Sequence, residues 1–125
     1  MKKGKQIGIE FSGIREKTDS GYTSYEYLIR ELSSGKAVGD CCLRAGDGLS
    51  DVGNLGYTVD PDFRGRGYAA EAAELLLCEA RELGFAEVTA VCRGENLPSR
   101  RVCEKIGGVT TQADDQNLIT YKIKL

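Results

Sequence analysis

Histidine is absent from the 125-residue chain. It is the side chain whose ordinary pKa lies closest to neutral, and it serves most often as a general base in enzymes. Its absence excludes every Ser-His and Cys-His nucleophile pair. Any catalysis by this chain therefore has to work without the usual base.

Cysteine is present, but not in the pattern of a metal site or a disulfide framework. The chain has five cysteines, an odd number, and contains no C-x-x-C segment. Without histidine, this predicts no zinc site and no other metal. We interpret the cysteines as reduced thiols that are buried as small apolar side chains. They are Cys41, Cys42, Cys78, Cys92 and Cys103.

Long apolar runs and an excess of positive charge are also lacking. No run approaches the roughly 18 apolar residues of a membrane span, and the start MKKGKQIGIEF lacks the apolar stretch of a secretory signal. The net charge of −2 and the isoelectric point near 5.2 argue against binding to a nucleic-acid backbone. We therefore expect a cytoplasmic protein with no membrane or nucleic-acid partner, built as one domain over residues 1–125.

The first half of the chain reads as strands and turns. Alternating apolar residues predict strands, with a polar loop from residue 12 to about residue 23 and a hairpin turn at residues 33–36. Pro61 is expected to end the last of these strands. The four predicted strands are 7–11, 25–32, 37–44 and 55–59.

The second half alternates helices with strands. Apolar residues at helical spacing predict a long helix from Ala69 to Leu83, ended by Gly84. A strand at 87–93, a short helix from Pro98 to Gly107 and a final strand at 119–125 follow. This order predicts an α+β fold in αβα layers, with a mixed, largely antiparallel central sheet.

A run of arginines and glycines, Arg64-Gly65-Arg66-Gly67, stands where the long helix has to begin. Glycine costs about 0.5–1 kcal/mol against alanine in regular structure. A strand that leads through glycines into a helix presents free N–H groups and a positive dipole end to an anion. The segment therefore predicts a phosphate site, although a surface turn with two solvated arginines would read the same way.

The segment fits two known patterns. Residues 65–70 match the dinucleotide fingerprint G-x-G-x-x-G/A, but the acidic residue at the right spacing, Glu87, would open the next strand rather than end it. A nucleotide-binding module stays open as a distant alternative. Arg64, Gly67 and Ala69 match the pattern [QR]-x-x-G-x-[GA] of the GNAT N-acetyltransferases.

The resemblance to the GNAT family extends beyond that pattern. The stretch LGYTVDPDFRGRGYAAEA is similar to the strand, loop and helix of the branch that acetylates ribosomal-protein N-termini and antibiotics, and ENLPSRRVCEKIGG resembles that branch's N-x-x-S-x-x-x-x-x-K-x-G segment. The similarity covers the chain from about residue 37 to the end. It implies the acyl-CoA N-acyltransferase fold and acetyl-CoA as cosubstrate.

The resemblance also implies which residues hold acetyl-CoA. Backbone groups at the end of the strand before the loop would pair with the pantetheine arm, and the N–H groups of the loop would hold the pyrophosphate beside the two arginines. Asn96 would reach the pantetheine and Ser99 would face the same ligand, although Asn96 also suits a helix start. The implied set is Tyr57, Thr58, Val59, Arg64, Gly65, Arg66, Gly67, Tyr68, Ala69, Asn96 and Ser99.

The implied reaction is direct attack of a primary amine on the acetyl thioester, with a protein N-terminus, a lysine or a small amine as acceptor. Many family members place a proton-donating tyrosine seven residues after the asparagine, where this chain has Cys103. A thiol can donate a proton. Cys103 also belongs to an apolar helical stripe with Val102 and Ile106, which gives it an alternative role in packing.

Two departures from the family bear on activity. The usual carboxylate base falls at Gly53, with Asp51 and Asn54 nearby. The stretch between Phe11 and Tyr25 is too short for the two helices that usually wall the acceptor site. A non-catalytic CoA-binding domain is therefore the main alternative function. Surface left uncovered near Tyr22, Tyr25 and Tyr27 predicts a homodimer whose second subunit helps to wall the cleft.

Overall fold

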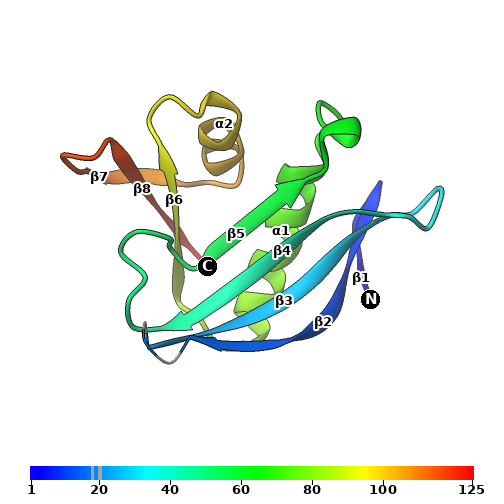
Figure 1. The fold of residues 1–125 in the computed structure, drawn as a ribbon, viewed down its shortest axis with the longest axis horizontal. Coiled ribbons are helices and arrows are strands. Elements are labelled where there is room, and N and C mark those ends of the chain that lie inside the picture. Colours follow the sequence, from blue (N-terminus) through cyan, green and yellow to red (C-terminus); the bar gives the residue numbers. More distant parts are fainter. Residues whose placement is uncertain (18, 20) are drawn as a thin grey trace.

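The computed structural model describes residues 1–17, 19 and 21–125. Its larger sheet is antiparallel and follows the chain, since each strand pairs with the next one in sequence. Figure 1 shows this sheet in blue to green along the chain. Its strands are β1 (Lys2–Lys3), β2 (Ile7–Lys17), β3 (Tyr22–Glu31), β4 (Ala37–Gly46) and β5 (Leu55–Val59).

The first hairpin differs from the sequence prediction. Residues expected in a polar loop belong to β2 and β3, which pair from Ile7 opposite Glu31 to Lys17 opposite Tyr22. A bulge between Phe11 and Gly13 shifts the register along the way. The prediction of a loop is wrong for residues 12–17, 22 and 23, because pairing between β2 and β3 holds their backbones extended. Residues 18 and 20 lie outside the described part of the chain.

A second, smaller sheet closes the chain. It consists of β6 (Glu87–Arg93), β8 (Leu118–Lys124) and β7 (Val109–Ala113), in the order β6-β8-β7 and antiparallel throughout. The sequence predicted β6 and the final strand, but not β7. Val109 is 67% exposed, and the threonines that follow it give β7 no apolar alternation.

Two helices complete the α+β fold, which is confirmed with its mostly antiparallel strands. The helix α1 (Tyr68–Glu82) packs on β2, β4 and β5 and buries a stripe of small residues that lets it lie close to the sheet. The short helix α2 (Leu97–Lys105) packs against α1 and β6, and a 3₁₀ turn, η1 (Pro61–Phe63), precedes α1. In Figure 1, α1 lies behind the larger sheet, and no helix of the described chain covers the face toward the viewer.

The two sheets meet at one end and then diverge. An isolated bridge joins Gly53 to Ala90. Beside it, the Asn54 N–H donates to the Thr89 carbonyl over 2.9 Å, and the Asn54 Oδ1 accepts from the Thr89 N–H over 2.8 Å and from its hydroxyl over 3.1 Å. We call this contact the Asn54 clamp. Beyond it, β5 and β6 run apart (Figure 1).

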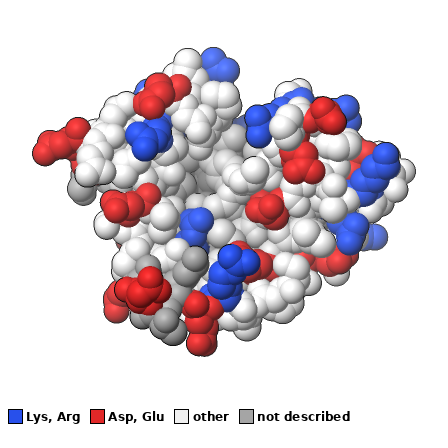
Figure 2. All heavy atoms as spheres, viewed as in Figure 1, with Lys and Arg blue, Asp and Glu red and all other residues white. Residues whose placement is uncertain are grey.

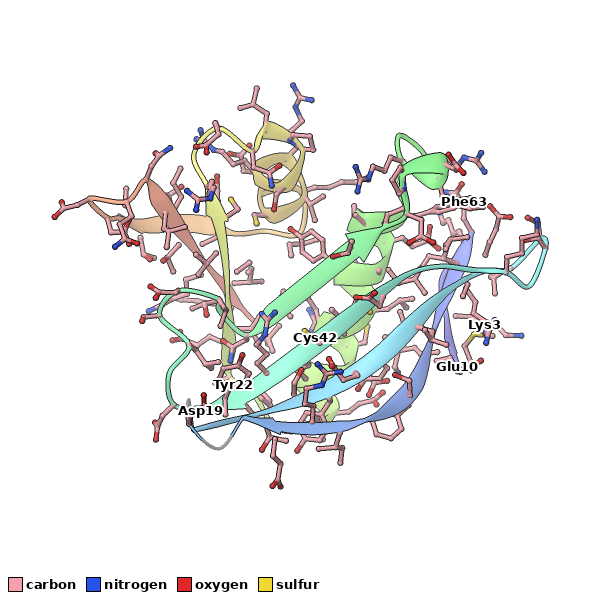
Figure 3. All side chains as sticks on the ribbon, in the orientation of Figure 1. Lys3, Glu10, Asp19, Tyr22, Cys42 and Phe63 are labelled. Carbon is pink, nitrogen blue, oxygen red and sulfur yellow. The ribbon has the colours of Figure 1, made fainter. Side chains whose placement is uncertain are left out.

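Of the three tyrosines expected near uncovered surface, Tyr25 and Tyr27 pack against the core. Tyr27 is buried, packs edge-on against Phe11 with ring centres 5.7 Å apart, and donates to Glu79 of α1 over 3.5 Å. Tyr22, labelled in Figure 3, is half-buried. The apolar side chains left exposed on β2 are Phe11 and Ile14. None of the helices in the described chain is long and apolar enough to span a membrane.

Candidate functional site

A groove of about 340 Å³ opens where β5 and β6 diverge. It reaches from the Asn54 clamp to the start of α2. Figure 2 shows the hollow between the part of the molecule that carries α2 and the part that carries β5 and η1. The residues that line it are Arg44, Asp51, Val52, Leu55, Gly56, Tyr57, Thr58, Ala90, Val91, Cys92, Asn96 and Ser99.

Alternate backbone groups of β5 face this groove. The Asn54 carbonyl accepts from Arg44 of β4, and the Asp60 N–H donates to Val38 on the same side. Because successive residues of a strand point their backbone groups to opposite edges, those of Tyr57 and Val59 point away from β4. The backbone of Thr58 faces β4, and its side chain lines the groove.

The loop before α1 leaves space at its glycines. Gly65 and Gly67 have φ of +80° and +81°, and beyond the neighbouring backbone no atom lies within 4 Å of the point where a Cβ would stand at either position. Gly67 occupies the N-cap position of α1 and makes no side-chain cap. The first N–H groups of a helix have no acceptor within that helix, so those of Tyr68 and Ala69 are available to a ligand.

The two loop arginines make contacts within the protein. The Arg64 Nε donates to the Val59 carbonyl over 2.9 Å and so fixes the loop to the end of β5. The Arg66 guanidinium lies 3.3 Å from the Glu31 carboxylate and stacks on the ring of Phe63, whose centre is 5.1 Å away. Figure 3 labels Phe63, the last residue of η1.

Glu31 contacts Arg66 and Tyr68 at the start of α1. Its carboxylate accepts from Ser34 over 2.6 Å and from the Tyr68 hydroxyl over 2.6 Å. Hydrogen bonds from Ser34 and Tyr68, with the nearby Arg66 charge, hold the pKa of this carboxyl below its ordinary value. Tyr68 is buried, so its side chain positions the start of α1 while its N–H faces the loop.

Asn96 begins α2. Its Oδ1 accepts from the Ser99 N–H over 3.3 Å, which is the cap interaction expected of asparagine at a helix start. The residue is exposed and lines the groove beside Ser99. The structure thus brings both predicted α2 residues to the same groove as Tyr57 and Thr58.

A cluster of three proton-bearing side chains joins β5 to α2. The Tyr57 hydroxyl lies 3.2 Å from the Ser99 Oγ and 3.6 Å from the Cys103 Sγ. Burial raises the pKa of Cys103 to about 11, and it also raises the pKa of the Tyr57 phenol. Both groups are therefore protonated at neutral pH. Cys103 is 1% exposed and is not among the described residues that line the groove.

The position of the usual base admits no side chain. A Cβ on Gly53 would lie 2.9 Å from the Thr89 carbonyl oxygen, and its φ is +72°. The Asn54 side chain is engaged in the clamp and donates to the Arg44 carbonyl over 2.9 Å. Among the described lining residues, Asp51 carries the one carboxylate.

Arg44 is a groove residue that the sequence prediction missed. Its Nη1 donates to the carbonyls of Val52, Gly53 and Leu55 over 3.1–3.4 Å, so it holds the turn that leads into β5. The sequence offers no signal for this contact, because it depends on the pairing of β4 with β5.

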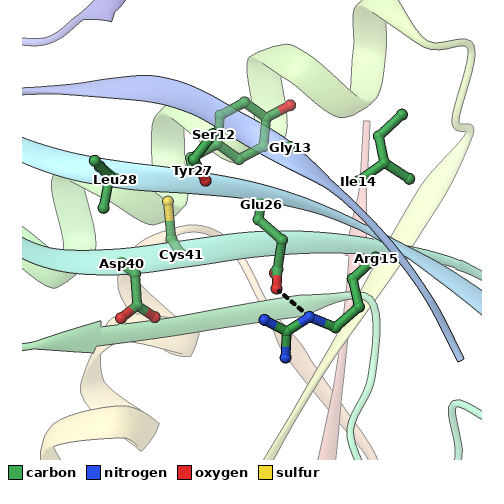
Figure 4. Close-up of a pocket in the computed structure, with 9 residues that line it drawn as sticks. All are labelled: Ser12, Gly13, Ile14, Arg15, Glu26, Tyr27, Leu28, Asp40 and Cys41. Atoms are coloured by element: carbon green, nitrogen blue, oxygen red, sulfur yellow. Dashed lines mark ion pairs between the residues drawn. The ribbon is translucent and has the colours of Figure 1, made fainter.

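A second hollow of about 480 Å³ lies on β2, β3 and β4, away from the predicted site residues. Figure 4 shows its lining, in which Arg15 pairs with Glu26 over 3.5 Å and Asp40 stands nearby. No group of three potential metal ligands occurs in the described part of the chain.

Comparisons with known proteins agree with this geometry. A family model described as an acetyltransferase (GNAT) domain matches residues 7–109. An uncharacterized N-acetyltransferase of Bacillus subtilis, YnaD, is 41% identical over 58 residues, which cover 42% of this chain and 32% of that protein. The crystal structure of an acetyltransferase from Agrobacterium tumefaciens superposes with a TM-score of 0.68 at 25% identity, covering 82% of this chain and 61% of that one.

A second similar structure is the microcin C7 self-immunity acetyltransferase MccE in complex with acetyl-CoA and AMP. It has a TM-score of 0.66 and 18% identity, covering 82% of this chain and 61% of MccE. At that identity the likeness shows the fold alone. The chain thus spans about a third of the curated relative and 61% of the solved chain from Agrobacterium.

Proposed function

The chain belongs to the GNAT acetyltransferase family, and from this premise we propose that it transfers the acetyl group of acetyl-CoA to a primary amine. The observation that carries the proposal is the groove between β5 and β6, whose wall at Tyr57 and Thr58 leads to the end of β5, where Arg64 fixes the glycine loop of α1 to the Val59 carbonyl. One end of such a site suits a thioester, and the other suits a diphosphate. The solved acetyl-CoA complex of MccE, which shares the fold, supports this choice of ligand.

The diphosphate would lie against the loop from Gly65 to Ala69. The absence of a Cβ at the two glycines leaves room for phosphate oxygens close to the backbone, and the helix dipole favours an anion there by about 0.3–1 kcal/mol at exposed sites. Arg64 and Arg66 border this space with positive charge. Arg66 is half-exposed, so its pairing with Glu31 is open to exchange for a phosphate.

The pantetheine arm would follow the free edge of β5. Its amides can pair with the backbone groups of Tyr57 and Val59 as an added strand would. Asn96 stands on the opposite wall, where its amide nitrogen can donate to the arm while its oxygen caps α2. The thioester would then lie in the groove near Ser99.

The amine must be neutral to attack the carbonyl carbon. A lysine with a pKa of about 10.4 is neutral less than about one time in a thousand at pH 7, whereas an α-amino group near 7.7–8.0 is much closer. Gly53 supplies no base, and Asp51 is the carboxylate that the groove offers. The site therefore suits an acceptor with a weakly basic amine, such as a protein N-terminus, better than it suits lysine.

A non-catalytic CoA-binding domain is the second candidate. The observation that favours it is the filled space at Gly53, where no base can stand. This alternative keeps the groove and the loop unchanged and differs only in the absence of transfer.

The deciding experiment is a calorimetric titration with acetyl-CoA on protein freed of CoA, followed by a thiol-release assay with N-terminal peptides, lysine peptides and polyamines. Binding and thiol release are expected, and acetyl-CoA at 100 times its Kd should stabilise the fold by about 2.7 kcal/mol. Binding without release from any acceptor would favour the second candidate. No binding at millimolar acetyl-CoA would refute both.

A further inference from the structure

The contact of Tyr57 with α2 is not explained by diphosphate binding at the glycine loop or by acceptor binding in the groove. Tyr57 is half-buried on β5, and its hydroxyl meets Ser99 and Cys103 of α2 at 3.2 and 3.6 Å. Tyr57 and Ser99 both line the groove. We propose that the Tyr57 phenol is the group that donates the proton to the CoA sulfur when the thioester breaks. This inference rests on the proposed function.

The sheet fixes the phenol in this place. Tyr57 is opposite Cys41 of β4, and Cys41 is opposite Tyr27 of β3, so the three side chains form one row on the face that the helices cover. The Tyr27 hydroxyl donates to Glu79 of α1, whereas the Tyr57 hydroxyl contacts Ser99 in the first turn of α2. Of the two tyrosines in this row, Tyr27 therefore lies in the core and Tyr57 lies in the wall of the groove.

Cys103 is poorly placed for the donation expected of it. Its side chain is 1% exposed and lies behind the Tyr57 hydroxyl as seen from the groove, because Tyr57 lines the groove and Cys103 does not. A helix residue with a longer side chain would reach the groove from this position. In this chain the short thiol leaves room for a phenol that arrives from β5 instead.

The reaction balances with this assignment. The amine nitrogen attacks the carbonyl carbon and forms the C–N bond, and the C–S bond breaks with its electron pair on sulfur. The sulfur takes the proton of the Tyr57 hydroxyl, which regains one from Ser99 and the water of the groove. The proton lost by the amine passes to solvent or to Asp51. Burial raises the pKa of Tyr57, which makes the phenol a weaker acid, so its donation to sulfur has to be concerted with delivery of a proton through Ser99.

The first test compares two tyrosine variants that each lose one hydroxyl. Tyr57→Phe is expected to lower kcat by about 100-fold while leaving the KM for acetyl-CoA unchanged, since the ring and the backbone of β5 remain. Tyr27→Phe is the matched control, because it lies in the same row and points away from the groove. Its kcat is expected to equal that of the wild type.

The second test does not depend on transfer. The thiol of bound CoA is titrated by the ultraviolet absorbance of its thiolate, and the titration of the complex with desulfo-CoA is subtracted to cancel the protein's own thiols. A phenol that donates to the sulfur favours the thiolate. The bound thiol should therefore ionise at higher pH in Tyr57→Phe than in the wild type or in Tyr27→Phe.

These tests separate the two proposals. If the wild type acetylates no amine, the proposed function fails, and the thiol titration still decides the role of Tyr57. An unchanged thiol titration in Tyr57→Phe overturns the inference. So does full activity of that variant, or a loss that appears in Ser99→Ala or Cys103→Ala but not in Tyr57→Phe.

Discussion

Gly67 and Gly35 have nearly the same backbone conformation in different parts of the chain. Their φ values are +81° and +75°, and beyond the neighbouring backbone no atom lies within 4 Å of a Cβ at either position. A side chain at either glycine costs about 1–2 kcal/mol, because the conformation is left-handed. We expect Gly67→Val to abolish acetyl-CoA binding and Gly35→Val to leave it intact, since Gly67 faces the predicted diphosphate and Gly35 turns the β3–β4 hairpin. Calorimetric titration of both variants measures this.

The two variants should lose similar stability, so a difference in binding reports the site rather than the fold. Thermal unfolding of each protein provides the check. Normal binding by Gly67→Val would show that the diphosphate is held elsewhere.

Buried thiols make the fold sensitive to alkaline pH. Burial raises the pKa of Cys103 from 9.0 to about 11, and burial also raises the pKa of Cys41. Folding therefore favours the neutral thiols. Their contribution to stability is complete below pH 9, where the unfolded thiols are still protonated, and it is lost as the pH rises toward 11.

We therefore expect the free energy of unfolding to fall between pH 9 and pH 11. Urea unfolding followed at several pH values measures it, and Cys103→Ala should show a smaller decline over the same range, because one of the titrating groups is gone. An equal decline in wild type and variant would contradict the assignment of this effect to Cys103.

The Asn54 clamp joins two elements that make few other contacts across the groove. Its side chain makes hydrogen bonds of 2.8 and 3.1 Å to Thr89 and one of 2.9 Å to Arg44. Asn54→Ala leaves these partners without acceptor or donor and is expected to cost about 1–3 kcal/mol. Because β5 and β6 then keep only the backbone contacts at Gly53 and at residue 54, the affinity for acetyl-CoA should fall as well.

Thr89→Ser is the matched control for the clamp. It keeps both the backbone N–H and the hydroxyl that meet Asn54, so its stability and affinity should stay close to those of the wild type. Chemical denaturation and acetyl-CoA titration of both variants test this. An Asn54→Ala protein as stable as the wild type would show that the bridge at Gly53 suffices.

Local sequence patterns predicted most of the helices and strands, whereas the remaining strands form because they pair with their neighbours. The helix expected from Ala69 to Leu83 is α1, and the strand expected at 87–93 is β6 with the same ends. Both carry clear apolar periodicity. The second half of β2 and all of β7 lack this periodicity. Their described side chains are mostly exposed to solvent and need not be apolar, while pairing with neighbouring strands holds their backbones extended.

The candidate site shows the same division. The glycine loop and Asn96 could be predicted from short motifs, because each motif shapes its own backbone. The contact between Tyr57 and Ser99 could not, since it joins residues 42 positions apart through the packing of β5 against α2. The clamp is equally invisible in the sequence, although Asn54 stood beside the position expected for a base.

At the scale of the whole molecule, the homodimer stays a prediction. The tyrosines first held to favour it are buried or half-buried, but Phe11 and Ile14 on β2 are 55% and 59% exposed. In the described chain β1 pairs with β2 only at Gly8 and Ile9, so the rest of this strand edge is open. Sedimentation at micromolar concentration should give a species near twice 13.6 kDa, and a clean monomer would contradict the dimer.

The order of strands in the two sheets has a consequence for how the chain folds. The strands from β1 to β5 pair strictly with their neighbours in sequence, so each hairpin can close as soon as it leaves the ribosome, at little cost in loop entropy. β6 has to wait for β8, which is made after α2 and β7. The nascent larger sheet meanwhile shows Ile9, Ile29 and Val38 to water, because α1, which packs over this sheet, is synthesised after it. Until α1 is made, these apolar side chains therefore expose the growing chain to aggregation and to capture by chaperones.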